Sequence, residues 1–326
     1  MKRFTLIASL LTGLTFSAFA DKKKVIFLTI DEKNHPSGMH EYYAGAVLLE
    51  DAIKNSPVKD EIEPVVLKGW PEDTAVFDDA AAIVHYYNGN RFHPLTKHVD
   101  VIDKVAKEGC GNIFIHYAVD PDTSNNDFLK KITGGVYKDK YSTNPHWEID
   151  AKLQNHPINS GVEPYKIVDE WYVNIDFINN EAQTAYEQPN VAAQVYSVMH
   201  GQEGSPGRLK GILKRDPKPS ENTVFWAITN EYGGRGAGFT GGHYHRNWAN
   251  DEFRKHILNA ITWVAQVEIP EGGVTSPAIS QEKINENLME GKKGGLVEID
   301  LSVPLTAPPQ KKPRGNKKKN KKKNDE

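Results

Sequence analysis

The chain of 326 residues contains a single cysteine, Cys110. One thiol cannot form an intramolecular disulfide, and a cysteine-based zinc site needs several thiols, so both are excluded. The sequence also lacks the Gly-x-Ser-x-Gly elbow of serine hydrolases and the phosphate loop that ends in Gly-Lys-Ser or Gly-Lys-Thr. The glycine-rich run 233–238 precedes a predicted strand instead of joining a strand to a helix, so it predicts a hairpin turn. No nucleotide cofactor is expected.

Long apolar runs are missing after residue 20. None approaches the ~18 residues of a membrane-spanning helix, so no transmembrane segment is expected in the mature protein. Residues 1–20 start with Lys2 and Arg3, continue with a short apolar run and end in small residues at Ala20. This pattern is typical of a secretory signal peptide. We expect cleavage near Ala20 and a periplasmic or secreted protein; the alternative is a retained N-terminal anchor.

Charge is divided unevenly along the chain, although the formal net charge is only −3. Residues 309–326 hold nine basic and two acidic residues, which leaves an acidic excess in residues 21–308. An acidic body argues against a nucleic-acid-binding core. The lysine-rich end has no apolar face and its like charges repel, so it is predicted to be disordered. It serves either as a solubilising tail or as a weak contact to polyanions such as anionic lipid, polysaccharide or nucleic acid.

Strand and helix patterns alternate through the body of the chain. Apolar runs rich in β-branched and aromatic residues predict strands at 24–30, 62–67, 80–87, 112–117, 192–199, 224–229 and 236–240. Apolar residues at helical spacing predict helices that begin near Tyr42, Thr96 and Asn250. Thr96 and Asn250 are suited to cap a helix. The alternation predicts a doubly wound, mostly parallel α/β sheet flanked by helices, as in flavodoxin-like folds. We expect one α/β domain over 21–270, an extended strap or linker over 271–308, and the tail; a homo-oligomer is compatible with this sequence.

In open parallel sheets, ligands bind beyond the carboxyl ends of the strands. Histidines and aromatic residues gather at these predicted ends, together with one arginine. Glu170 is also a candidate, although it follows none of the predicted strands. The candidate site residues are His35, His40, Tyr86, Tyr87, His116, Glu170, His243, His245, Arg246 and Trp248. Cys110 precedes its strand and is therefore expected at the opposite pole, away from any chemistry.

Two imidazoles and a carboxylate suit zinc or iron, so His116, Glu170 and His243 are candidate ligands of a divalent metal. Their spacing does not separate this hypothesis from plain acid–base chemistry. His243 and His245 are two residues apart and point to opposite faces if the strand persists. His35 and His40 lack the i, i+4 spacing of helical metal ligands and are assigned to substrate binding instead.

Several short motifs occur in the order and spacing of the ThuA-like (trehalose utilisation) family. They are 109–116, 156–158, 169–172, 233–236, 241–243, Trp248 and the helix 253–263. The resemblance covers roughly residues 23–270. Within the family the sequence is most similar to secreted members that carry the segments 68–71 and 144–147.

The resemblance implies a fold like that of class I glutamine amidotransferases, without their activity, because no cysteine follows the strand that ends at His116. It further implies a part in disaccharide catabolism, including work on 3-keto sugars made by a partner dehydrogenase. A keto group acidifies the adjacent C–H, so a base can drive enolisation, isomerisation or elimination. His116 and Glu170 are the expected proton carriers, and only the resemblance places Glu170 near His116. His243 and His245 are expected to orient hydroxyls or to hold a metal.

The remaining candidates are expected to bind the sugar. His35, His40, His245 and Arg246 are suited to contact hydroxyl groups. The aromatic rings of Tyr86, Tyr87 and Trp248 stack against a sugar ring or pack in the core. The sequence thus predicts an exported carbohydrate-processing enzyme; the alternative is a non-catalytic carbohydrate-binding protein that uses the same site.

Overall fold

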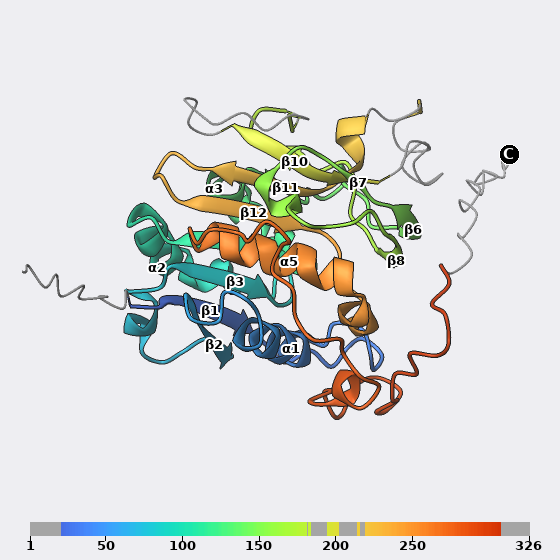
Figure 1. The fold of residues 1–326 in the computed structure, drawn as a ribbon. Coiled ribbons are helices and arrows are strands. Elements are labelled where there is room, and N and C mark those ends of the chain that lie inside the picture. Colours follow the sequence, from blue (N-terminus) through green and yellow to red (C-terminus); the bar gives the residue numbers. More distant parts are fainter. Residues whose placement is uncertain (1–20, 181, 184–193, 202–213, 216–218, 308–326) are drawn as a thin grey trace, which may run out of the picture.

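The computed structural model describes residues 21–180, 182–183, 194–201, 214–215 and 219–307. The expected signal peptide and the lysine-rich tail lie outside these residues. The body is a three-layer arrangement in which helices cover both faces of an eight-stranded sheet (Figure 1). Within the described residues, no helix has the length and apolar character needed to span a bilayer.

Five neighbouring strands of the sheet are parallel. In spatial order they are β2 (Ile62–Lys68), β1 (Lys23–Thr29), β3 (Ala82–Tyr86), β4 (Gly111–Ile115) and β12 (Arg235–Phe239). Pro64 lies in β2, at the edge of the sheet, where its missing N–H is tolerated. The carboxyl ends of all five strands therefore lie along one side of the molecule.

The other three strands extend the sheet in antiparallel fashion beyond β12. They are β11 (Thr223–Thr229), β10 (Val195–His200) and β7 (Lys152–Leu153). Residues 230–234 join β11 to β12 as the predicted hairpin, and Gly233 adopts the positive φ of 81° that this turn requires. A connection this short permits only an antiparallel pair. The predicted doubly wound, mostly parallel α/β fold is confirmed.

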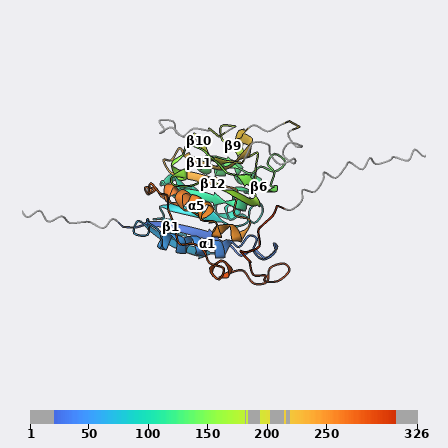
Figure 2. The same cartoon turned by 45° about the vertical axis from the view of Figure 1, so that its right-hand side comes forward.

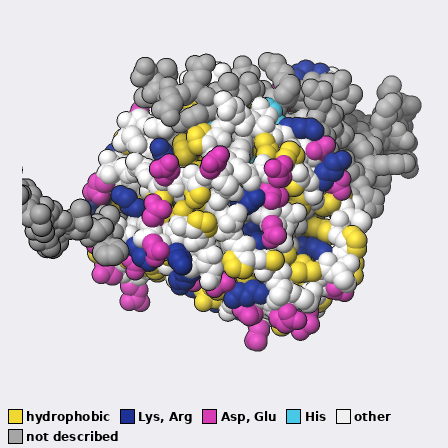
Figure 3. All heavy atoms as spheres, in the orientation of Figure 1, with side chains coloured by type: hydrophobic (Ala, Val, Ile, Leu, Met, Phe, Trp, Pro, Cys, Tyr) yellow, Lys and Arg dark blue, Asp and Glu magenta, His cyan; other side chains and the backbone are white. Residues whose placement is uncertain are grey.

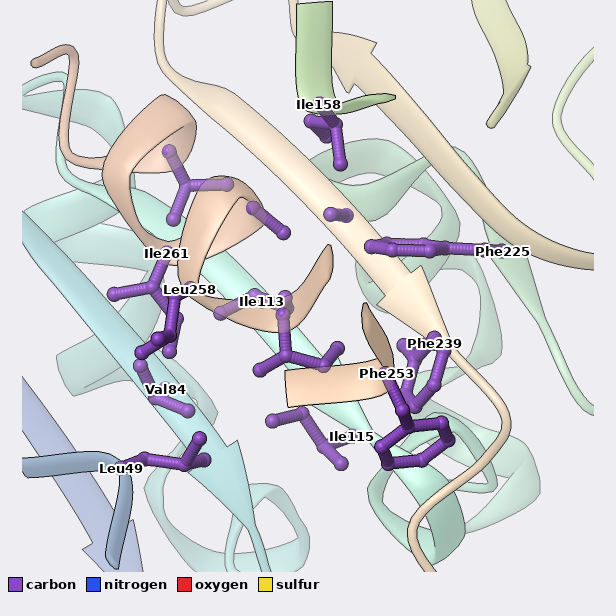
Figure 4. Packing of buried hydrophobic residues seen from close by; sticks show 14 of the residues in the cluster. Leu49, Val84, Ile113, Ile115, Ile158, Phe225, Phe239, Phe253, Leu258 and Ile261 are labelled. Carbon is purple, nitrogen blue, oxygen red and sulfur yellow. The ribbon is translucent and has the colours of Figure 1, made fainter. Parts of the chain in front are cut away.

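Each central strand is buried on both faces, and its alternate residues enter two separate cores. In β1, Phe27 packs with α1 (Tyr42–Lys54) and α5 (Asp251–Val264), whereas Leu28 packs with α2 (Leu95–Lys107) and α3 (Asn126–Thr133). Figure 4 shows the first core, where Leu258 and Ile261 of α5 face Val84 and Ile113 of the sheet. The α5 helix begins at the predicted cap, since the Asn250 side chain accepts from the Phe253 N–H at 2.9 Å.

Shorter elements connect and flank the main strands and helices. Two antiparallel pairs, not predicted from the sequence, join β5 (Gly135–Val136) to β9 (Asp176–Phe177) and β6 (His146–Asp150) to β8 (Lys166–Glu170). The 3-10 helices are η1 (Thr74–Phe77), η2 (His116–Val119), η3 (Thr123–Asn125), η4 (Pro157–Asn159), η5 (Pro219–Asn222), η6 (His245–Ala249) and η7 (Lys283–Asn285).

Residues 271–307, which we call the C-terminal strap, lie along the body and contain only η7 as regular structure. Figure 1 and Figure 2 both show the strap passing below α1 toward the carboxyl ends of the strands. Ile284 of η7 is fully buried and anchors the strap to the α1–α5 face. On the described part of the face in Figure 3, acidic and basic side chains are interspersed, so this face offers no basic patch for nucleic acid.

Candidate functional site

Four side chains that are distant in the sequence meet beyond the carboxyl ends of the parallel strands. His40 lies in the loop after β1, His116 begins η2 directly after β4, and His243 follows β12. Because parallel strands share their carboxyl end, the topology accounts for the three histidines. Glu170 comes from the end of β8, in a separate two-stranded sheet. We call these four residues the histidine–glutamate cluster.

The cluster is tight enough for one ion to touch every member. His40 Nε2 lies 2.9 Å from His243 Nδ1 and 3.2 Å from His116 Nε2. His116 Nε2 and His243 Nδ1 are 3.3 Å apart. The Glu170 Oε2 atom lies 3.3 Å from His243 Nδ1 and 3.6 Å from His116 Nε2. All four ligand atoms lie within 4.8 Å of one another.

Hydrogen bonds on the far side of two rings determine their tautomers. His116 Nδ1 faces the carbonyl oxygen of Thr240 at 2.9 Å and must donate to it. The Tyr42 hydroxyl donates to Asn88 Oδ1 at 2.8 Å, so it accepts from His40 Nδ1 at 2.5 Å. With both Nδ1 atoms protonated, His40 and His116 direct the lone pairs of their Nε2 atoms toward each other.

Two facing lone pairs at 3.2 Å repel each other, and a cation bound beside both nitrogens would remove this repulsion. Ligands about 2.1 Å from a tetrahedral zinc ion are about 3.4 Å from one another. Five of the six separations in the cluster lie between 2.9 and 3.6 Å and bracket this value. The donor set, three imidazoles and one carboxylate, is therefore suited to a divalent transition metal such as zinc or iron.

Two members of the cluster have strained backbones. His40 and His116 have φ values of 52° and 56°, in the left-handed region that residues other than glycine rarely adopt. Each such residue costs about 1–3 kcal/mol and persists only where the surroundings enforce it. In this protein the His40 N–H donates to the His243 carbonyl oxygen at 3.0 Å, which ties two ligand-bearing loops together.

The Glu170 carboxylate is held by groups outside the cluster. Asn144 Nδ2 donates to Glu170 Oε1 at 2.9 Å, and His146 Nε2 lies 3.3 Å from the same oxygen. Burial alone raises the pKa of Glu170, but hydrogen bonds from His146 and His243 and the histidine charges hold it well below its usual value. Glu170 is therefore an anionic ligand, with its orientation determined by Asn144 and His146.

Asp169, the neighbour of Glu170, joins the loop of His243 to β8. Its buried carboxylate accepts from the backbone N–H groups of Gly242 at 2.8 Å and His243 at 3.0 Å. It also accepts from Asn247 Nδ2 at 2.9 Å and from the Glu170 N–H at 2.7 Å. One side chain thus positions two members of the cluster at once.

The cluster is most accessible beside His35 and His146, whose side chains are 36% and 30% exposed. The ring of His35 stacks on His40, with centroids 3.8 Å apart. His146 Nδ1 lies 2.9 Å from the Tyr244 hydroxyl. A molecule that approaches the cluster meets these two histidines first, because the side chain of His116 is fully buried.

The structure adds His40 to the candidate metal ligands. His40 was expected to bind substrate and not metal, yet its Nε2 is central to the cluster; helical spacing was the wrong criterion, because each ligand comes from a different element. His116 is predicted both as a proton carrier and as a candidate metal ligand. Burial, followed by the charge of His243, lowers the pKa of His116 to about 3, so the ring is neutral and offers a lone pair. That state suits a metal ligand better than a proton carrier.

Three aromatic candidates do not reach the site. Tyr86, Tyr87 and Trp248 are fully buried and pack in the two cores, so they cannot stack against a sugar ring. The Tyr86 hydroxyl donates to the Gly242 carbonyl oxygen at 2.6 Å, and Trp248 packs on Phe253. Their position directly after or near a strand end did not reveal which way each side chain points.

Two polar candidates also lie elsewhere. His245 is fully buried beside the strap, and its N–H donates to the Gly38 carbonyl oxygen at 2.9 Å. Arg246 donates to the Val303 carbonyl oxygen of the strap at 2.5 Å. The residues that sequence reasoning missed as site residues are Tyr42, Asn88, Asn144, His146, Asp169 and Tyr244. Only the family motifs 144–147 and 169–172 contained a signal for some of them.

Cys110 lies directly before β4, at the pole opposite the cluster, as predicted. Burial raises the pKa of its thiol to about 12, so the reactive thiolate is suppressed. We expect Cys110→Ser to leave metal content and any activity unchanged, and the native thiol to react with Ellman's reagent only after denaturation. Rapid labelling of the native protein would show that this thiol is accessible, contrary to the structure.

Comparisons with known proteins point to one family. The family model described as trehalose utilisation (ThuA) matches residues 71–264. The solved structure of a ThuA-like protein from Parabacteroides merdae is 12% identical, covers 79% of this chain and 98% of its own, and has a TM-score of 0.50. A ThuA-like protein from Bacteroides uniformis is 16% identical, with coverages of 76% and 93% and a TM-score of 0.51. At these identities the likeness concerns the fold alone, and no curated protein matches the sequence.

Proposed function

Since this chain belongs to the trehalose utilisation (ThuA) family, we propose that it is an exported, metal-dependent enzyme that processes carbohydrates. The observation that carries the proposal is the pair of facing Nε2 lone pairs of His40 and His116 at 3.2 Å, with an anionic carboxylate beside them. A cation bound between these atoms would remove the repulsion of the two lone pairs and balance the carboxylate charge. The proposed ligands are His40, His116, His243 and Glu170.

A divalent ion held by these residues would supply a Lewis acid for a keto or hydroxyl oxygen of the sugar. The protein's own contribution to proton transfer is proposed to come from His146. This ring is partly exposed, and its two nitrogens lie beside Glu170 and the Tyr244 hydroxyl. General acid–base catalysis needs such reach toward the substrate, which the buried His116 does not have.

The proposed substrate is a keto sugar or a glycoside from disaccharide breakdown. The family's description supports a carbohydrate, and a keto group would give the proton adjacent to it the acidity that a histidine base can use. Export is proposed from the signal-peptide pattern that ends at Ala20.

The test combines metal analysis with a mass-spectrometric screen of keto-glycosides. Full-length protein purified without chelator should contain about one transition-metal ion per chain, and chelation should remove both the metal and any conversion. Cys110→Ser is the control and should behave as wild type. Metal without conversion, but with sugar binding, would favour a carbohydrate-binding protein; absence of metal under every loading condition would refute the metal centre.

A further inference from the structure

The C-terminal strap lies outside the family match, which ends at residue 264, and it places one lysine inside the protein. Lys292 has a side chain that is fully buried, unlike its neighbour Lys293, which is exposed. Gly291 and Gly294 flank the pair with φ values of 73° and 89°. These left-handed conformations, which glycine adopts without strain, form the turn that inserts Lys292.

The Lys292 ammonium lies directly beneath the loop that carries His40. Its Nζ donates to the carbonyl oxygen of Met39 at 2.6 Å and to that of His40 at 3.3 Å. Two buried carboxylates complete its surroundings, with Glu32 Oε2 at 3.5 Å and Glu41 Oε1 at 3.8 Å. The ammonium therefore contacts the peptide groups on both sides of the His40 α-carbon.

Burial of an ammonium costs several kcal/mol unless the charge is paired and hydrogen-bonded. Glu32 and Glu41 balance the charge of Lys292, and the two carbonyl oxygens accept its hydrogens. These hydrogen bonds and ion pairs hold the His40 loop in one position, whereas an apolar side chain at position 292 would allow the loop to shift.

Neighbouring strap residues fasten the same loop from its two ends. The Met289 N–H donates to Glu41 Oε2 at 2.9 Å, and the Lys293 N–H donates to the Lys33 carbonyl oxygen at 3.1 Å. The Ser37 hydroxyl donates to the Val297 carbonyl oxygen at 3.0 Å. The loop is thereby enclosed between the strap and the His243 loop.

The strained backbone of His40 explains why such support is needed. A left-handed residue other than glycine costs about 1–3 kcal/mol, so an unsupported loop would relax and turn the His40 ring away from the cluster. The Lys292 contacts act on the carbonyl oxygen of this residue itself. These contacts therefore hold the His40 backbone in its left-handed conformation.

We propose that Lys292 is a positioning residue for the metal ligand His40, and that the C-terminal strap is thereby a required part of the metal site. The proposal rests on the metal centre put forward above. It extends the site beyond the family-matched region, to a residue 252 positions away from His40.

The test measures metal affinity in the full chain. Lys292→Met removes the ammonium and keeps the length of the side chain, and Lys293→Met is the matched control on the exposed neighbour. Dissociation constants for Zn²⁺ are obtained by competition with a chromophoric chelator, and Co²⁺ absorption reports the ligand geometry. Lys292→Met should weaken Zn²⁺ binding by roughly 10–100-fold, as does loss of other groups that orient a ligand. Lys293→Met should bind as wild type does.

The outcomes separate this proposal from the metal centre. If wild type binds no metal, both ideas fail; if wild type and Lys292→Met bind equally, only the role of Lys292 is refuted. A lower melting temperature with unchanged affinity would show a merely structural role. Lys292→Gln, which keeps a donor for the carbonyl oxygens, replaces the methionine variant if that does not fold. If neither folds while Lys293→Met does, Lys292 supports the whole fold and the specific proposal is overturned.

Discussion

His116→Ala should lose its bound metal and most of its turnover. The substitution removes a neutral imidazole whose Nε2 lone pair is directed at the proposed metal position. This nitrogen is the ligand atom that lies near both His40 Nε2 and Glu170 Oε2. Loss of a residue that only orients a metal ligand weakens metal binding by about 10–100-fold. Loss of a direct ligand should therefore weaken metal binding by more than that. Metal content by mass spectrometry and Zn²⁺ affinity by chelator competition are the measurements.

His256→Ala is the matched control for this experiment. His256 is an equally buried histidine on α5, and it lies beside Tyr165, away from the cluster. It should keep its metal even where its stability falls, because its ring has no part in the ligand set. Equal metal affinity in wild type and folded His116→Ala would refute the role of His116 as a ligand.

Asp169→Ala should be among the most destabilising substitutions in the chain. It leaves the N–H groups of Gly242 and His243 without their acceptor in a buried place, and Asn247 loses one of its two. Each buried donor left unsatisfied costs about 1–3 kcal/mol, so we expect a loss of about 3–5 kcal/mol in the free energy of unfolding. Urea denaturation monitored by circular dichroism measures this change.

Asp127→Ala provides the comparison. The side chain of Asp127 is 99% exposed, so its replacement should change the free energy of unfolding by no more than about 0.5 kcal/mol. The stability of Asp169→Asn should lie between those of Asp169→Ala and Asp127→Ala, because one side-chain oxygen still accepts hydrogen bonds. Similar stabilities for Asp169→Ala and Asp127→Ala would mean that this carboxylate does not organise the site.

The amino-acid pattern was sufficient to predict the convergence of His116 and His243. Apolar runs identified the strands, the alternation with helices implied parallel pairing, and parallel pairing places strand ends on one side. The glycine-rich turn before β12 and the Asn250 cap were equally local features, and both are present. These predictions succeeded because each depends on short-range sequence.

The sequence pattern did not predict which way individual side chains point. Tyr86 and Tyr87 are adjacent at the end of β3, yet one packs in each core and neither reaches the opening of the site. His40 was set aside as a ligand because its spacing suits no helical pair. His146 lies on β6, a strand whose pattern was too short to recognise. A short irregular segment carries little periodic signal, so its course depends on what it packs against.

The sequence by itself determined the fold class, the positions of the main strands along the chain and the pole at which histidines gather, because these follow from periodicity, caps and turns along neighbouring residues. Only the tertiary structure decided which histidines form the cluster and in which tautomer. Those properties depend on contacts between remote segments, such as His116 with Thr240 and Lys292 with His40. A hydrogen bond requires atoms within about 3 Å, and no pattern of residue types specifies position that closely.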